Sequence, residues 1–395
     1  MNILYLTYDG LMEPLGQSQV LAYQEKLAKD FKIVLMSFEK SEDLKDRTKL
    51  KLMQERVSKT SIKWIVRRYH KFPSILATAY DLFAGIIHCS YLVMRYRIKV
   101  IHARSYPPAL IALFFKKFFG IKFIFDMRGF WADERVDGDI WKKDSQIFKV
   151  TKRLEKSFIT NADHIISLTH AAVNEINQFP YIGSAPLNIS VISTCVDLEK
   201  FTPTKNDIPS KDFTLGYLGT VGTWYLFKET VYAFKVFLQI NPAGRILIIN
   251  KGEHQFIRES MLNQNIPLSS VEILSANHDE IPSLIKKMSA TVFFLKPLFS
   301  KQAAAPTKLG EFLASGIPCL TNEGVGDMAT ILNAGGAGKT LSQLDVDSIE
   351  SGIKELIKLT QQEDIIIKCR TTAELNFSLT NGIESYSKIY KSILT

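Results

Sequence analysis

Short apolar runs alternate with helical segments along almost the whole chain, and this alternation limits the possible folds more than any other feature. Seven runs in the first half indicate strands: Ile3–Leu6, Ile33–Ser37, Ile62–Val66, Val100–Ala103, Phe123–Asp126, His164–Leu168 and Ile189–Ile192. Five more indicate a second series: Thr214–Leu218, Ile246–Asn250, Glu272–Leu274, Thr291–Leu295 and Cys319–Asn322. Strands separated by helices are typical of parallel sheets with helices on both faces. The sequence therefore predicts an α/β protein with two doubly wound, Rossmann-like domains.

A polar, proline-containing segment without periodicity, Ser193–Pro209, separates the two series. The chain has 395 residues, which is too long for one typical hydrophobic core. We therefore expect a first domain over residues 1–193, a linker over 194–209 and a second domain over 210–378.

The second domain contains a compact strand-to-helix segment. After the apolar run Thr291–Leu295, Pro306 and Thr307 are typical of a helix start, and Gly316 followed by Pro318 is typical of a helix end. The free backbone N–H groups of such a helix start attract an anion. The sequence thus predicts an anion site at Pro306–Thr307.

Two charged residues add to this expectation. Lys308, in the first helical turn, supplies a cation, and Glu311, one turn later, supplies an acceptor-only carboxylate suited to a pair of ribose hydroxyls. Together they indicate a nucleoside diphosphate. The alternative is an ordinary strand-to-helix turn with a solvated lysine and glutamate.

Four segments resemble glycosyltransferase family 4, whose members are retaining sugar transferases of the GT-B fold. They are Pro306–Pro318 continued by Asn322–Asp327, the glycine-containing segment Asp9–Leu21, the segment Phe125–Gly129, and Leu218–Trp224. The resemblance implies that the two domains face each other across a cleft. It also implies that a last helix, residues 379–395, packs back on the first domain.

The chain departs from the family pattern at two places. The family commonly has two glutamates separated by seven residues, and counting back from Glu311 places Ala303 at the first of them. The usual Arg and Lys pair in the first loop of the second domain is also absent, since Thr220 and Val221 follow Gly219. Lys308 is our candidate for the missing positive charge.

The resemblance and the local chemistry together select the candidate site residues. We expect the donor to be bound by Gly16, Gln17, Gly219, Thr220, Thr307, Lys308, Leu309 and Glu311. Gly16 and Gln17 are expected in a loop whose backbone approaches the diphosphate closely.

The candidate catalytic residues are Asp126 and Arg128, which end a predicted strand. Asp126 would orient an acceptor hydroxyl or the donor sugar, and Arg128 would pair with a phosphate. The alternative is a local ion pair that holds the loop. A fixed cation and aligned N–H groups stabilise a leaving diphosphate by themselves, so we expect neither a metal nor another cofactor. Asp137-Gly138-Asp139 resembles the carboxylate pair of metal-dependent transferases, but its glycine and acidic residues favour a solvated turn.

The charge of the chain is unevenly distributed. Residues 1–195 hold 29 Lys and Arg against 19 Asp and Glu, and the remainder holds 20 against 21. A basic first domain suits an anionic membrane surface or a phosphate-bearing acceptor. No basic helix with base-reading spacing is present, so we expect no nucleic-acid partner.

The cellular location follows from the cysteines and the N-terminus. Cys89, Cys195, Cys319 and Cys369 have no metal-ligand spacing, which favours reduced thiols, and Met1–Thr7 enters a strand without a secretory signal. We expect a cytoplasmic protein that can associate with the inner face of the cytoplasmic membrane.

The segment Ile75–Met94 is largely apolar and is flanked by basic residues, which superficially resembles a membrane span. Asp81 and His88 argue against a span because an ionisable side chain is costly in hydrocarbon. A buried or interfacial helix is the better interpretation.

The expected function is therefore transfer of a sugar from a nucleotide-diphosphate sugar to a hydroxyl of a glycan or polyprenyl-linked acceptor, in surface polysaccharide synthesis. The first alternative is a non-catalytic nucleotide-sugar-binding subunit, which Ala303 suggests. An epimerase or phosphorylase would need an acid pair or a cofactor lysine that we cannot place in the sequence. A membrane-recruited structural protein would have no use for Lys308 and Glu311.

Overall fold

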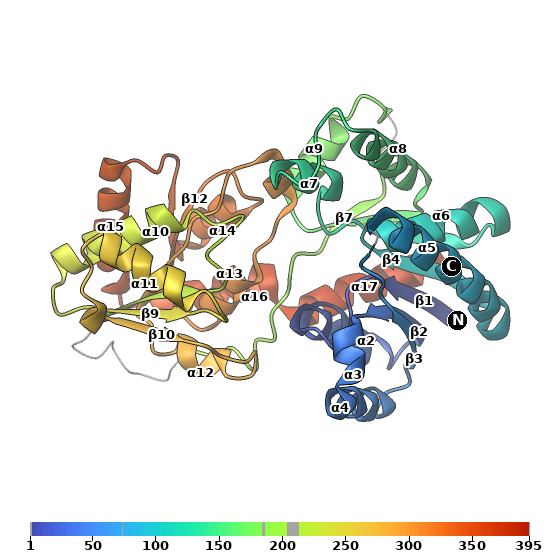
Figure 1. Cartoon of the computed structure of the whole chain (residues 1–395), viewed down its shortest axis with the longest axis horizontal. Coiled ribbons are helices and arrows are strands. Elements are labelled where there is room, and N and C mark those ends of the chain that lie inside the picture. The colour runs from blue at the N-terminus through green and yellow to red at the C-terminus, as the bar shows by residue number, and fades with distance from the viewer. Residues whose placement is uncertain (1, 73, 184–185, 204–212, 395) are drawn as a thin grey trace. The chain divides into compact units, whose positions relative to one another are not determined.

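The computed structural model describes residues 2–72, 74–183, 186–203 and 213–394 and divides the chain into two compact units. Unit 1 comprises Met1–Ile192 and Thr380–Thr395, and unit 2 comprises Ser193–Leu379 (Figure 1). Each unit is built on one parallel sheet with helices between the strands. The predicted α/β fold with two parallel sheets is confirmed.

The sheet of unit 1 has the strand order β3-β2-β1-β4-β5-β6-β7. Its strands are β1 (Asn2–Thr7), β2 (Lys32–Glu39), β3 (Lys63–Arg68), β4 (Ile98–Arg104), β5 (Lys122–Asp126), β6 (His164–Ser167) and β7 (Ile189–Val191). Its helices are α1 (Pro14–Gly16), the π-helix η1 (Gln17–Leu21), α2 (Ala22–Leu27), α3 (Ser41–Lys45), α4 (Arg47–Ser58), α5 (Ser74–Tyr96), α6 (Tyr106–Phe119), α7 (Trp131–Asp137), α8 (Gln146–Asn161), α9 (His170–Asn177) and α17 (Leu379–Leu394).

The sheet of unit 2 has the order β10-β9-β8-β11-β12-β13. Its strands are β8 (Thr214–Leu218), β9 (Arg245–Ile249), β10 (Val271–Leu274), β11 (Ala290–Val292), β12 (Cys319–Asn322) and β13 (Gly338–Leu341). Its helices are α10 (Phe227–Ile240), α11 (His254–Asn263), η2 (Leu268–Ser270), α12 (Ile281–Ile285), η3 (Phe299–Ala303), α13 (Thr307–Ala314), α14 (Met328–Gly335), α15 (Val346–Thr360) and α16 (Ile365–Phe377).

The strand sequences explain why both sheets lie between layers of helices. The side chains of β1 after its first residue and those of β9 after its first residue are all buried, so both faces of these strands are covered. Near-continuous runs of Ile, Leu and Val are what such doubly covered parallel strands require. In an open parallel sheet, ligands bind beyond the carboxyl ends of the strands, where the candidate residues of both units lie.

Two strand predictions needed correction. Thr291–Leu295 was expected to be one strand, but β11 ends at Val292. The N–H group of Leu295 donates to Oδ1 of Asn322 instead of to a neighbouring strand. β13 was not predicted, because its sequence, Gly-Lys-Thr-Leu, has one large apolar residue and lies at the sheet edge.

The boundary between the units differs from the expected linker. Val196 and Phe201 are buried in the core of unit 2, and the backbone of Val196 pairs with that of Ser378. Residues 193–203 therefore belong to unit 2, whereas residues 204–209 of the expected linker lie outside the described residues. From Thr380 onward, α17 is part of unit 1, where Tyr390 is buried and its hydroxyl contacts His102 (Figure 1).

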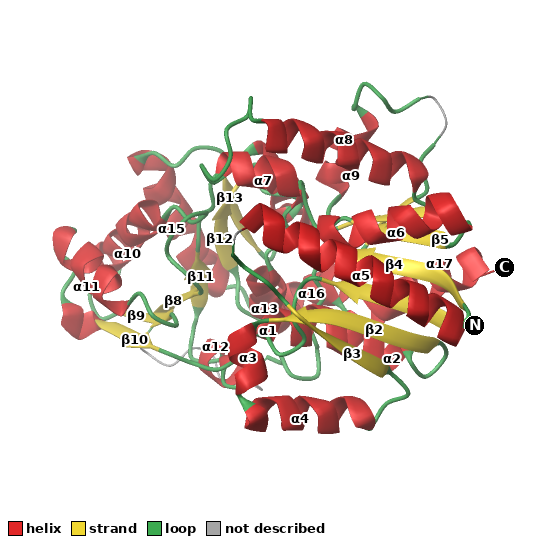
Figure 2. Cartoon of the chain, turned by 45° about the vertical axis from the view of Figure 1, so that its right-hand side comes forward, coloured by secondary structure: helices red, strands yellow, loops and turns green. Residues whose placement is uncertain are grey.

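α5 is the one helix among the described residues that is long and apolar enough to cross a membrane. It lies beside α6 on one face of the sheet of unit 1 (Figure 2). Of its apolar window, 28% is buried, so most of this window is not covered by other described residues.

Candidate functional site

Lys308 is the centre of the candidate site in unit 2. It is in the first turn of α13, and its side chain runs back to the carboxyl end of β8, where Nζ donates a hydrogen bond to the carbonyl of Leu218. Nζ also lies 4.0 Å from the ring centroid of Tyr225 and 5.0 Å from that of Tyr217. Aromatic faces stabilise a cation, so the ammonium is held in place without an acidic partner.

Gly219 makes room for this ammonium. Its φ of +114° is unfavourable for any residue with a side chain. A Cβ atom at this position would lie 2.8 Å from Nζ of Lys308. The glycine that ends β8 and the lysine that begins α13 therefore depend on each other, although 89 positions separate them in the sequence.

Glu311 lies one turn after Lys308 on the same helix. It is 7% exposed, and its carboxylate makes no hydrogen bond or ion pair with any described residue. Burial raises its pKa to about 7, and the nearby positive charge of Lys308 lowers it only in part. A buried carboxylate without a donor is unstable in its charged form, so this group is available to accept hydrogen bonds from a ligand.

The other donor-site candidates of unit 2 lie around the same helix start. Pro306 is the N-cap and Thr307 the first helical residue, as expected, and Thr307 is half-buried. The N–H groups of Thr307 and Lys308 have no acceptor among the described residues. Leu309 contributes its side chain to the core of unit 2, and its N–H group donates to the carbonyl of Pro306.

The loop after β8 is held by residues that sequence reasoning missed. The carboxylate of Glu253 accepts hydrogen bonds from the N–H group of Val221 and from the amide of Asn250, which also donates to the carbonyl of Gly219. Thr220, a predicted donor contact, is exposed at the tip of this loop. Asn250 directly follows a strand, which is the one sequence signal that would have identified this pair.

A second cation–π pair lies in unit 2 and was also missed. Nζ of Lys301 is 3.6 Å from the ring centroid of Trp224, and Lys301 is 5% exposed. Two residues later, at the position where the family commonly has its first glutamate, Ala303 is 2% exposed. This position is therefore buried and carries no polar atom beyond its backbone.

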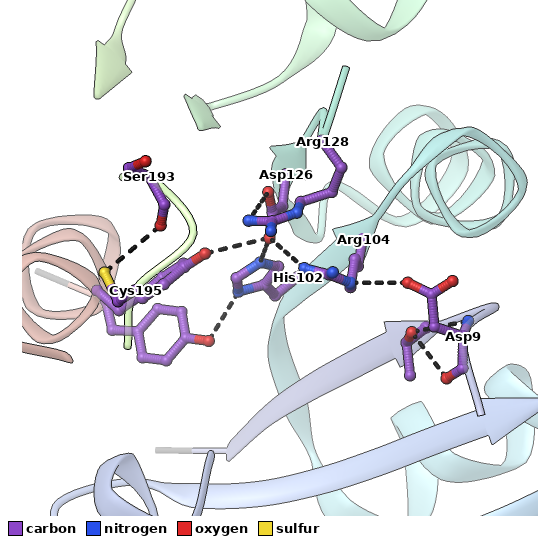
Figure 3. A network of polar contacts seen from close by, with 10 residues as sticks. Asp9, His102, Arg104, Asp126, Arg128, Ser193 and Cys195 are labelled. Atoms are coloured by element: carbon purple, nitrogen blue, oxygen red, sulfur yellow. Dashed lines mark hydrogen bonds and ion pairs between the residues drawn. The ribbon is translucent and has the colours of Figure 1, made fainter. Parts of the chain in front are cut away.

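In unit 1 the predicted catalytic residue Asp126 is completely buried. Figure 3 shows its polar contacts. Its Oδ1 lies 3.7 Å from the guanidinium of Arg128, and its Oδ2 lies 3.8 Å from that of Arg104 and accepts a hydrogen bond of 3.2 Å from the hydroxyl of Tyr386. His102 Nε2 is 3.5 Å from the same oxygen. This arrangement matches the local ion pair that was the alternative to a catalytic role, with more partners than expected.

The electrostatics of this cluster follow from its burial. Burial opposes the charge of Asp126, but Arg128, His102 and Arg104 outweigh it and lower the pKa of this carboxyl to about 2. Burial lowers the pKa of His102, so its ring is neutral at pH 7 and lies 2.7 Å from the hydroxyl of Tyr390 through Nδ1. Asp126 is thus an anion at neutral pH.

Arg128 is the member of this cluster nearest to solvent. Its side chain is 12% exposed, and its backbone has a φ of +58°, which is rare for a residue with a side chain. Arg104 reaches the other way and donates from Nε to Oδ2 of Asp9 at 3.0 Å. The carboxyl ends of β1, β4 and β5 are thereby joined by charged side chains.

Gly16 and Gln17 were expected in a loop, and this expectation was wrong. Gly16 ends α1 and Gln17 begins η1, so both are helical. A Cβ atom at Gly16 would lie 1.9 Å from the carbonyl oxygen of Gly10, so the glycine serves close backbone packing within unit 1. The N–H group of Gln17 donates to the carbonyl of Glu13.

The described residues contain no group of three or more His, Cys, Asp and Glu side chains that fits a metal ion. Asp137 ends α7 and Asp139 follows in a turn, in agreement with the interpretation of this acidic segment as a turn.

Comparison with known structures identifies the class of fold. A glycosyltransferase from Rickettsia africae superposes with a TM-score of 0.73 at 14% identity, covering 100% of this chain and 98% of that chain. HepE from Anabaena, solved in complex with UDP-glucose, gives a TM-score of 0.70 at 15% identity over 99% and 100% of the two chains. The fold of this chain is GT-B.

Sequence comparison supplies the family. Residues 21–200 match the family described as Glycosyltransferase Family 4. A UDP-Gal:alpha-D-GlcNAc-diphosphoundecaprenol alpha-1,3-galactosyltransferase from Escherichia coli is 24% identical over 219 residues, which are 52% of this chain and 54% of that protein. The match therefore spans about half the length of this relative. Together with the GT-B fold, these matches make the chain similar to glycosyltransferases of the family-4 type.

Proposed function

We propose that this protein transfers a sugar from a nucleoside-diphosphate sugar to a hydroxyl group of a glycan or polyprenyl-linked acceptor. The observation that carries the proposal is the cluster at the start of α13, in which a restrained ammonium, two free N–H groups and a carboxylate without a partner surround one helix terminus. These groups match, in order, the charge of a diphosphate, its oxygens and the two hydroxyls of a ribose. An ordinary solvated turn would not bury a lysine and a glutamate together.

The proposed chemistry follows from where charge develops. As the bond between sugar and diphosphate breaks, negative charge grows on the leaving oxygen, and Lys308 with the N–H groups of Thr307 and Lys308 stabilises it. The ammonium is already held by the carbonyl of Leu218 and by Tyr225, so little reorganisation is needed. We propose that transfer needs no metal, and activity that survives an excess of chelator is the expected result.

The finer features of the proposal rest on family resemblance. We propose retention of the anomeric configuration, an acceptor carried on a polyprenyl diphosphate, and a role in surface polysaccharide synthesis at the cytoplasmic face of the membrane. UDP-hexoses are the first donors to test, because the E. coli relative is named for UDP-galactose and HepE was solved with UDP-glucose. The product's anomeric proton signal in NMR distinguishes retention from inversion.

In this proposal Asp126 and Arg128 act in the unit that binds the acceptor. Because Asp126 is completely buried, its role is to fix Arg128, whose partly exposed guanidinium is the group available to a phosphate or hydroxyl. Asp126 is then a positioning residue, and Arg128 is the candidate for direct contact.

A non-catalytic nucleotide-sugar-binding subunit is the second candidate. The observation that favours it is the buried Ala303 at the position of the family's first glutamate, since this position offers the donor sugar no carboxylate. Binding assays alone do not separate the two candidates, because both bind the donor.

The test combines donor binding with turnover. Wild-type protein and the variants Lys308→Gln and Glu311→Gln are titrated with UDP-, GDP- and ADP-sugars, and sugar transfer to lipid-extracted acceptors is followed by mass spectrometry. Binding of one donor that both variants weaken, together with transfer, supports the enzyme. Binding without transfer to any acceptor supports the subunit. Absence of binding, or wild-type affinity in both variants, refutes the donor site itself.

A further inference from the structure

The solvent face of α5 carries an unbroken row of large apolar side chains. This row, called the α5 stripe here, consists of Leu76, Tyr80, Phe83, Ile87, Tyr91 and Met94. Its members are spaced three or four residues apart, so they project from one side of the helix. Each is between 56% and 74% exposed. α5 lies at the front of unit 1 in Figure 2, with no other described element of this unit drawn over it.

The inner side of this helix is closely packed against unit 1 and includes its one acidic residue. Asp81 is 1% exposed and accepts hydrogen bonds from the hydroxyl of Tyr8 at 3.0 Å and from the N–H group of His70 at 2.9 Å. Its second oxygen lies 2.6 Å from Nδ1 of His70. Gly85, on the same inner side, packs so tightly that a Cβ atom would lie 2.8 Å from Cδ1 of Ile111 in α6. α5 is thus anchored to unit 1 by its inner face.

Exposed basic residues lie at both ends of the α5 stripe. Residues 67–122 contain ten Lys and Arg side chains and a single acidic one, the buried Asp81. Arg68 and Lys71 are exposed before the helix, and Arg95 and Lys99 are exposed at its end. Any partner that covers the stripe therefore meets cations at both ends of it.

The end of α6 adds exposed aromatic residues near the end of α5. α5 leads into β4 and α6 leads into β5, and these strands are parallel neighbours, so both helices end at the amino edge of the sheet. There α6 exposes Phe118 and Phe119 beside the exposed Lys117. Aromatic rings next to lysines are typical of residues at a lipid–water interface.

We propose that the α5 stripe, with Phe118 and Phe119, docks unit 1 onto an anionic lipid bilayer, with α5 lying in the plane of the interface. The apolar row enters the headgroup region, and the lysines and arginines at its ends contact anionic lipid phosphates. This surface goes beyond the proposed transfer reaction, because it requires neither a donor nor an acceptor.

The same observations argue against a helix that crosses the bilayer. A spanning α5 would withdraw Asp81 from Tyr8 and His70 and place its carboxylate in hydrocarbon, where a charge is costly. Its inner face would also leave the packing with Ile111. A helix that keeps one face in the protein and presents the other to lipid retains all these contacts.

The experiment is sedimentation of the full chain with vesicles of phosphatidylcholine containing about 30% phosphatidylglycerol, and with vesicles of phosphatidylcholine alone. The test variant is Phe83→Gln/Ile87→Gln. The matched control is Phe256→Gln/Leu262→Gln, which removes two exposed apolar side chains from a helix of unit 2. A third variant, Lys99→Gln/Lys117→Gln, removes charge alone.

We expect wild type and control to bind the anionic vesicles equally. The stripe variant should bind at least tenfold more weakly, in line with the transfer free energy of two large side chains. The charge variant should lose the preference for anionic over neutral vesicles. Absence of binding by wild type, or equal losses in the stripe variant and the control, overturns the proposal. Two other results would also overturn it. One is protein that stays in the membrane when the membrane is extracted at high pH, which indicates a span. The other is self-association through the stripe without vesicle binding.

A labelling experiment keeps the proposal testable if the stripe variant fails to fold. All four native cysteines are buried, so an introduced Ile87→Cys is the preferred site for a polarity-sensitive fluorophore on the folded chain. Its emission should shift to the blue on anionic vesicles, whereas the same probe at Leu262→Cys should not respond. An unshifted probe at residue 87 on vesicle-bound protein refutes docking through α5.

Discussion

The raised pKa of Glu311 makes the proposed donor site testable through protons. The group has a pKa of about 7 in the folded protein against an ordinary value of 4.5. An ionised carboxylate offers both of its oxygens as acceptors to the two ribose hydroxyls, whereas a protonated one uses one oxygen to carry the proton, so donor binding favours loss of the proton. The observed affinity is then reduced by the fraction of protein that is still protonated.

The magnitude follows from the pKa. About nine in ten molecules are protonated at pH 6, half at pH 7 and about one in ten at pH 8. Donor affinity should therefore rise about tenfold from pH 6 to pH 8, and binding at pH 7 should release about half a proton. The titration should use a nucleotide sugar and not a free nucleoside diphosphate, because the phosphates of a nucleotide sugar do not titrate between pH 6 and 8.

Calorimetric titration in two buffers of different ionisation enthalpy measures both the donor affinity and the number of protons released on binding. Glu311→Gln is the matched control, since it keeps the shape of the side chain and has no proton to lose. It should bind more weakly than wild type at pH 8 and show no pH dependence. Wild-type affinity that is flat between pH 6 and 8, or an equal slope in the variant, would refute the assignment of the ribose to Glu311.

The same group affects stability without ligand. Because its folded pKa lies above the unfolded value, Glu311 favours the folded state at low pH, and this contribution is lost as the pH rises through 7. The loss is at most about 3 kcal/mol for a shift of this size. Added donor should therefore stabilise unit 2 more at pH 8 than at pH 6 in thermal unfolding.

Three further changes test other parts of the structure. Lys308→Gln should weaken binding of a nucleoside diphosphate at least tenfold and that of the nucleoside little, and equal effects on both ligands would contradict a phosphate contact. Asp126→Asn removes the buried anion between Arg104 and Arg128 and should lower the free energy of unfolding by about 3 kcal/mol in urea titrations at pH 7, with donor affinity unchanged. The stabilisation by wild-type Asp126 should itself vanish as the pH falls from about 4 to 2, because its folded pKa is depressed to about 2. Gly16→Ala should lower the free energy of unfolding by at least about 1 kcal/mol, because the added methyl group would collide with the backbone of Gly10. An unchanged melting temperature would show that this segment can move to accommodate the methyl group.

The predictable parts of this fold were those in which local sequence decides the structure. Runs of β-branched and other apolar residues gave the positions of the buried strands, and a proline before a polar residue gave the start of α13. The edge strand β13 was not predicted because an edge strand is less covered than a central one and therefore needs fewer apolar residues. Gly16 misled because a glycine that serves close packing inside a helix looks the same in sequence as one in a loop.

The features that could not be predicted depend on contacts between distant residues. Asp81 was taken as evidence against a membrane span, but the sequence did not show that its partners Tyr8 and His70 hold it on the inner face of α5. Asp126 was correctly predicted at the end of a strand, but its burial was not, because its local sequence gives no sign of its contact with Tyr386, which is 260 residues further along the chain. Burial of a charged residue is set by such partners and not by its local sequence.

The C-terminal helix α17 has a consequence for the order in which the protein matures. Tyr386 and Tyr390 complete the hydrogen bonds of Asp126 and His102, yet they are made only after all of unit 2 has been synthesised. A ribosome at residue 380 has therefore produced a first unit whose buried polar centre still lacks two hydroxyl groups. Unit 1 is therefore the first unit to begin folding, and its buried polar centre is completed only after the residues of unit 2 have been synthesised.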